Sequence, residues 1–149
     1  MPISNTFKKR LIDLIEETDL HKGDFAKAVG ISANTISHAT LYGILPNLST
    51  LIKIADYLNI PLDYLLGKTD DPAFYPTDHR SSFHERLISL TTERNTKFSK
   101  IARSMPFSQN LFYEWMRRKT MPDVENLYFL AEYFQVSADY LLGRTDYKD

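Results

Sequence analysis

The chain contains an internal repeat, because a shift of 76 residues lays one half of the sequence on the other without a gap. Residues 7–70 align with residues 83–146, and 20 of the 64 aligned positions are identical. Two copies are too few for a solenoid, which stacks at least three repeats to bury a continuous core. The repeat therefore predicts two tandem domains, at residues 1–70 and 83–149, joined by a linker at residues 71–82.

Apolar residues of the first copy recur at helical spacing, and no segment alternates as a half-buried strand does. A first helix is expected around residues 7–15, with further helices at 22–29 and 32–42. Asn47 can cap a fourth helix. Pro61 suits the first turn of a short fifth helix, which Gly67 would end. The predicted fold class is all-α, with five helices in each tandem domain.

Residues 26–46, AKAVGISANTISHATLYGILP, have the spacing of two short helices joined at a sharp angle. Ala26 is small where the helices must cross, and Gly30 suits a turn residue at positive φ. Ile36 would anchor the second helix in the core, and Ser32 can cap its first turn. The side chains then left pointing outward are Asn34, Ser37, His38 and Leu41.

This segment resembles the helix-turn-helix of the Cro and phage-repressor family of DNA-binding regulators, also called lambda-repressor-like or Xre. The resemblance covers about residues 7–70, and it includes the restart at Pro46–Leu51 and the ending at Leu62–Gly67. It implies that the third helix enters the major groove of double-stranded DNA, where its N-terminal side chains reach base edges. It also implies a transcriptional repressor that needs no cofactor, and a homodimer or a pseudo-dimer of the two repeats.

In the first copy, the positions that match the family's reading residues carry side chains suited to base edges. An asparagine can bond adenine at two atoms, and the Thr35 methyl group can meet a thymine methyl group. Lys22 matches a position that touches the DNA backbone in the family, and a lysine there favours phosphate. The candidate DNA-binding residues of this copy are Lys22, Ser32, Ala33, Asn34, Thr35, Ser37 and His38.

The second copy departs from the pattern where function would lie. Pro106 replaces Gly30, so the same left-handed turn cannot form, and Met105 is expected to leave helical geometry. Glu114 would face DNA with the wrong sign unless it accepts from a cytosine amino group. The candidate residues are Gln109, Asn110 and Tyr113 for bases, and Arg117, Arg118 and Lys119 for phosphates.

Other interpretations of these residues stay open. Asn34 and Asn110 can simply solvate the start of a helix, and Arg117–Lys119 can be an ordinary solvated turn. A protein-interaction module, such as an antirepressor or an assembly factor, is the alternative function, and the second copy favours it most. The near-neutral net charge of −1 also favours it, since nucleic-acid-binding domains are usually basic.

Family relatives often form dimers through the fourth and fifth helices, so Leu62–Leu66 and Ala138–Leu142 are candidates for pairing. Phe74 and Tyr75, in the middle of the linker, are expected either to pin it onto one domain or to contact a partner. Fully extended, a linker of twelve residues spans ~40 Å. Half-sites on one face of DNA lie ~34 Å apart, so both copies can reach successive turns.

Composition excludes several other classes of protein. The absence of cysteine excludes disulfides and thiolate metal sites, and the four histidines show no metal-ligand spacing. No glycine-rich phosphate loop is present, so an enzyme is not expected. The N-terminus lacks a signal-peptide pattern, and no apolar stretch approaches ~18 residues. The expected location is the cytoplasm, with no membrane partner.

Overall fold

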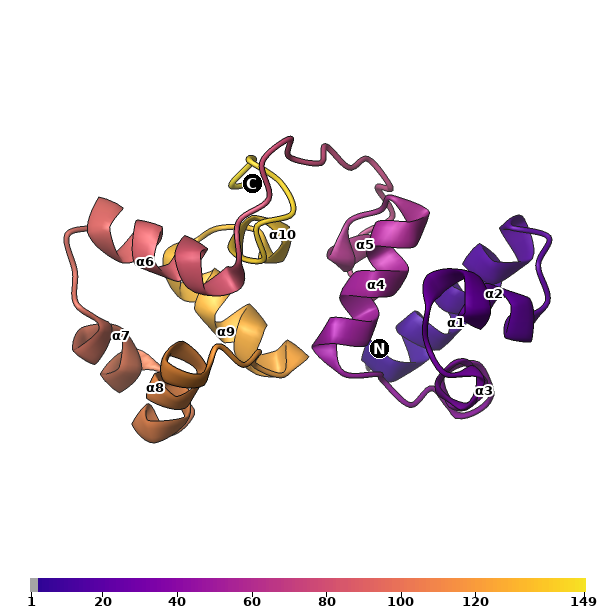
Figure 1. The fold of residues 1–149 in the computed structure, drawn as a ribbon, viewed down its shortest axis with the longest axis horizontal. Helices are drawn as coiled ribbons and strands as arrows, with labels where there is room; N and C mark the ends of the chain where they lie inside the picture. Colours follow the sequence, from indigo (N-terminus) through magenta and orange to yellow (C-terminus); the bar gives the residue numbers. More distant parts are fainter. Residues whose placement is uncertain (1–2) are drawn as a thin grey trace. The chain divides into compact units, whose positions relative to one another are not determined.

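The computed structural model describes residues 3–149, which form ten α-helices and no named strand (Figure 1). The helices belong to two compact units, of which the first extends to Phe74 and the second begins at Tyr75. The prediction of an all-α chain is confirmed for the described residues. Each unit is considered by itself below.

The first unit consists of five helices around one apolar core. They are α1 (Ile3–Glu17), α2 (Lys22–Val29), α3 (Ala33–Tyr42), α4 (Leu48–Leu58) and α5 (Leu62–Leu65). The Asn47 side chain caps α4 by accepting from the Thr50 N–H at 2.9 Å, as predicted. Pro61 is the N-cap of α5 rather than a first-turn residue, because its ψ of 150° is extended. The fully buried core side chains include Phe7, Leu11, Phe25, Ile36, Leu51, Ile54, Leu62 and Leu65.

The second unit contains α6 (Phe83–Glu93), α7 (Phe98–Ser104), α8 (Gln109–Arg118), α9 (Val124–Phe134) and α10 (Ala138–Leu141). The bounds of α8, α9 and α10 are those of α3, α4 and α5 shifted by 76 residues. Helix α7 ends early, because Met105 before Pro106 is extended with φ −91° and ψ 151°, as predicted. Phe112 and Trp115 are buried at the positions of Ile36 and Ala39.

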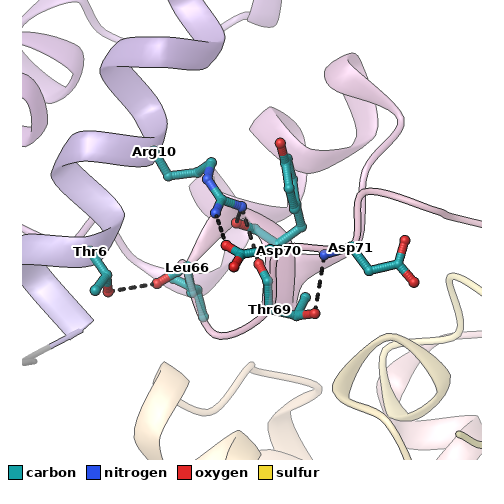
Figure 2. Close-up of polar contacts among 7 residues, drawn as sticks. Thr6, Arg10, Leu66, Thr69, Asp70 and Asp71 are labelled. Atoms are coloured by element: carbon teal, nitrogen blue, oxygen red, sulfur yellow. Dashed lines mark hydrogen bonds and ion pairs between the residues drawn. The ribbon is translucent and has the colours of Figure 1, made fainter.

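An arginine on α1 fastens the end of the first unit (Figure 2). Arg10 Nη1 donates to the carbonyl oxygens of Tyr64, at 2.7 Å, and Thr69, at 3.2 Å. Arg10 Nη2 lies 3.0 Å from Asp70 Oδ1, and the guanidinium carbon lies 3.9 Å from the centre of the Tyr64 ring. One side chain thus donates to a carbonyl of α5 and to a carbonyl beyond it, and covers an aromatic ring. Arg86 takes the same place in the second unit, 4.1 Å from the centre of the Tyr140 ring.

Much of the predicted linker is part of the second unit. The Tyr75 carbonyl accepts from Thr145 Oγ1 at 2.6 Å, and the Thr77 N–H donates to the Arg144 carbonyl at 3.0 Å. The rings of Tyr75 and Tyr147 lie 5.3 Å apart. Tyr75 therefore pins the chain onto one unit, and the extended tether of twelve residues is wrong.

The segments expected to pair are buried. Leu62, Leu65 and Leu66 are fully buried, and Leu141 and Leu142 are at most 5% exposed. These side chains complete the cores of their own units, since α5 packs on α1 and α4, and α10 on α6 and α9. These leucines are therefore not free to pair copies or chains, and pairing through other residues of the two segments stays a prediction.

We predict that Arg10→Met destabilises the first unit by about 1–3 kcal/mol, because the Thr69 carbonyl loses its Arg10 donor and the Tyr64 carbonyl is left with backbone donors such as the Gly67 N–H. Urea denaturation followed by circular dichroism measures the change. Asp70→Asn is the matched control, and it should have a much smaller effect because exposed ion pairs contribute little. Equal losses from the two substitutions would show that the carbonyl contacts do not stabilise the unit.

The hydrogen bonds at the start of α6 predict that the stability of the protein depends on pH. The Ser82 N–H donates to Glu85 Oε1 at 3.1 Å, and the Glu85 N–H donates to Ser82 Oγ at 3.0 Å. The bond from the Ser82 backbone, with a smaller contribution from its side chain, holds the pKa of Glu85 below its ordinary value of 4.5.

Because folding favours the ionised carboxylate, its stabilising effect is present above pH 4.5 and is lost as pH falls through the lowered pKa. Glu85→Gln keeps a hydrogen-bond acceptor but cannot titrate. We therefore expect the wild-type protein to lose stability relative to Glu85→Gln as the pH falls below 4.5. Urea unfolding of both proteins at pH values on either side of 4.5 measures the difference, and a constant difference would contradict the expectation.

Candidate nucleic-acid interface

The turn between α2 and α3 is built around a glycine in the left-handed region. Gly30 has φ 87°, and its N–H donates to the Ala26 carbonyl at 2.9 Å. The Ile31 N–H donates to the same carbonyl, also at 2.9 Å, so that the chain leaves α2 sharply. The predicted turn at Gly30 is confirmed.

Buried side chains hold one face of α3 in the core of the first unit. Ile36 and Ala39 are fully buried, and Phe25 and Ala26 of α2 are at most 1% exposed. Thr40 is 3% exposed, and its hydroxyl donates to the Ile36 carbonyl at 2.8 Å. Ser32 caps the helix as predicted, since its Oγ accepts from the Asn34 N–H at 3.1 Å. One face of α3 is therefore committed to the core.

The opposite face of α3 carries the residues that the sequence predicted to point outward. Asn34 and His38 are exposed, while Thr35 and Ser37 are half-buried. Ser32, Ala33 and Lys22 are also exposed, the last at the first position of α2. The seven candidates of the first copy thus lie on α2, on α3 or at its cap, and none of them is buried.

The end of α3 adds an apolar surface that sequence reasoning recognised only in part. Leu41 is 54% exposed, as expected, but Tyr42 is 70% exposed and Ile44 is 54% exposed. The His38 and Tyr42 rings lie 6.3 Å apart, which joins this surface to the polar face of the helix. Tyr42 lies four residues after His38, and this i, i+4 spacing was the signal available in the sequence.

In the second unit, the equivalent helix pair encloses an aromatic core. The ring centres of Phe98 and Phe112 are 5.8 Å apart, and those of Phe107 and Trp115 are 4.9 Å apart. Ser108 caps α8, because its Oγ accepts from the Asn110 N–H at 3.1 Å. Phe98 therefore packs inward at the position that Lys22 holds in the first unit.

The outer face of α8 holds the predicted residues of the second copy around a shallow hollow. Asn110, Tyr113, Glu114, Met116 and Arg117 line it. Tyr113 and Leu111 are 42% and 38% exposed. The remaining candidates, Gln109, Arg118 and Lys119, are also exposed. Lys119 ends α8 at φ 57°, where the first unit has Gly43 at φ 68°.

Glu114 forms ion pairs with two of the predicted phosphate-binding residues. Its carboxylate accepts a hydrogen bond from the Arg117 guanidinium, and its Oε2 lies 2.9 Å from Arg118 Nε. These pairs were not predicted from the sequence, although the i, i+3 and i, i+4 spacing along a helix was the signal available. In this structure the carboxylate balances the arginines instead of standing alone on the surface.

Neither a metal-ligand group nor a membrane-spanning helix is found in the described residues. Residues 3–149 contain no group of three or more His, Asp or Glu side chains that could hold a metal ion. None of the helices in that range is long and apolar enough to cross a membrane.

Comparison with protein families shows that residues 11–65 match the model of a helix-turn-helix family. The match includes part of α1 and all of α2 to α5, so the first unit contains a helix-turn-helix domain. Such a domain indicates a DNA-binding transcriptional regulator, in a family that is typically not enzymatic. Comparison with curated proteins and with solved structures found no match.

Two glycines of α2 and its turn provide a matched test of the backbone geometry. A Cβ added at either Gly23 or Gly30 would meet no atom within 4 Å. Gly30→Ala should nonetheless destabilise the unit by about 1–2 kcal/mol, because an alanine is strained at positive φ. Gly23→Ala, in the helix, should instead stabilise it by up to about 1 kcal/mol. Thermal unfolding measures both changes, and the same sign for both would contradict this assignment.

Proposed function

We propose that the protein is a sequence-specific transcriptional repressor that reads the major groove with α3. The observation that carries the proposal is the division of α3 into two faces. Ile36 and Ala39 are fully buried, while Asn34 and His38 are exposed on the same helix. A helix held in this way presents polar side chains at a fixed orientation, which is what base recognition requires.

Each candidate residue of the first unit has a proposed role. Asn34 bonds an adenine at two atoms, and Thr35 contacts a thymine methyl group. Ser37 and His38 contact base edges further along the groove. Lys22, at the exposed start of α2, binds phosphate and fixes the register of the helix. Ser32 and Ala33 form the first turn of the reading helix.

We propose a second helix-turn-helix domain in the second unit. Its support is the coincidence of helix bounds under the 76-residue shift and the shared Ser–Asn cap at the start of α8. In this proposal Gln109, Asn110 and Tyr113 face bases, while Arg117, Arg118 and Lys119 face phosphates. The two domains of one chain then act as a pseudo-dimer on neighbouring half-sites.

A protein-interaction module is the second candidate, and the surface of α8 favours it. Leu111 and Tyr113 are exposed, and Met116 lines the hollow beside them. Exposed apolar groups of this kind are typical of protein contacts. In that case the chain is an antirepressor or an assembly factor, and selection from random duplexes should enrich no sequence.

The repressor proposal predicts that Asn34→Ala weakens binding to the preferred site by about 1–3 kcal/mol, because one bidentate base contact is lost. The preferred site is first found by selecting duplexes from a random library with the full chain. The selection repeated with Asn34→Ala should lose preference at one base position. Asn5→Ala, an exposed asparagine on α1, is the matched control and should keep the preference. An unchanged preference in Asn34→Ala would show that Asn34 does not read sequence.

A further inference from the structure

Positive charge is concentrated in one segment of a chain that is otherwise acidic. Residues 97–119, which form α7, its turn and α8, contain six basic residues and one acidic residue. The remainder of the chain has 12 basic and 18 acidic residues. A local net charge of +5 therefore lies within a protein of net charge −1.

The side chains of this segment are arranged so that its cations face solvent. Its apolar residues are buried, with Ile101 and Phe112 fully buried and Trp115 4% exposed. All six basic residues are exposed, and we call them the basic surface of the second unit: Lys97, Lys100, Arg103, Arg117, Arg118 and Lys119. Since α7 and α8 pack on each other, these charges belong to one compact element.

The equivalent segment of the first unit differs in charge. Residues 21–43 contain two basic residues and one acidic residue. Under the 76-residue shift, Asp24 takes the place of Lys100, and Leu41 and Tyr42 take the places of Arg117 and Arg118. The helix pair with the polar reading face thus has a net charge of only +1. The pair with a net charge of +5 has an aromatic core and a carboxylate on its outer face.

We propose that the two units divide the work of binding duplex DNA. The basic surface of the second unit supplies most of the sequence-independent attraction to phosphates, and α3 of the first unit supplies the base reading. Phosphate contacts release counterions, so this attraction is the part of the affinity that falls with salt. This proposal rests on the proposed function, but the binding of phosphates by the second unit can be tested separately.

Glu114 weakens the proposed binding of phosphates by the basic surface. Its carboxylate is the one negative charge in residues 97–119, and it is bound to both Arg117 and Arg118. A phosphate must compete with the carboxylate for the two guanidinium groups, which lowers the gain from each contact. Removing the negative charge should therefore strengthen binding to DNA of any sequence.

The test measures binding of the full chain to a labelled duplex of mixed sequence, at salt concentrations between about 50 and 200 mM. The double variant Lys100→Gln/Arg103→Gln should reduce the slope of log affinity against log salt by about 2, because each phosphate contact contributes about 0.9. The matched control is Lys9→Gln/Lys53→Gln, which removes two exposed charges from helices α1 and α4 of the first unit. The control should change the slope by much less.

Glu114→Gln should raise affinity for the same duplex and steepen the slope by about 1. Glu132→Gln, an exposed position on α9, makes the same change in net charge and should not reproduce this effect. Circular dichroism confirms that each variant is folded. Equal effects of the test and control pairs, or no binding of the wild-type protein at about 50 mM salt, would overturn the proposal.

These measurements distinguish failure of this proposal from failure of the proposed repressor function. Enrichment of a sequence by the wild-type chain, together with unchanged salt slopes in the variants, would overturn the division of work while the repressor proposal stands. Reduced slopes in Lys100→Gln/Arg103→Gln without any enriched sequence would overturn the repressor proposal, and the basic surface would remain a phosphate-binding site.

Discussion

The burial of one face of α3 is the constraint on which the candidate interface depends. Ile36 and Ala39 are fully buried against the residues of α2, and Gly30 allows the chain to turn sharply between the two helices. Without that anchorage a helix of ten residues would be marginal in water. The core therefore both stabilises α3 and fixes which of its side chains face outward.

The two units apply the same constraint with different side chains. Where the first unit buries Ile36 and Ala39, the second buries the larger Phe112 and Trp115, and Phe98 and Phe107 pack beside them. The turn before α8 does not use a left-handed glycine, since Met105 is extended and Pro106 stands at the position of Gly30. The same helix bounds thus carry two surfaces of different chemistry.

The connection between the units is shorter than the sequence suggests. Tyr75 and Thr77 pair with the chain around Thr145, and Arg10 binds Asp70 at the end of the first unit. Both ends of the predicted linker are thereby held, each in its own unit.

The sequence by itself determined the helices, their caps and the outward residues of α3, because these follow from local rules. Periodicity places Ile36 inside and Asn34 outside, and a glycine or a proline decides the turn within a few residues. It did not determine the place of Tyr75 or the burial of Leu62, since both depend on contacts about 60 to 70 residues away along the chain. Only the tertiary structure decided these points, because pairing and burial are properties of neighbours in space, and a linear pattern does not specify which distant segments become neighbours.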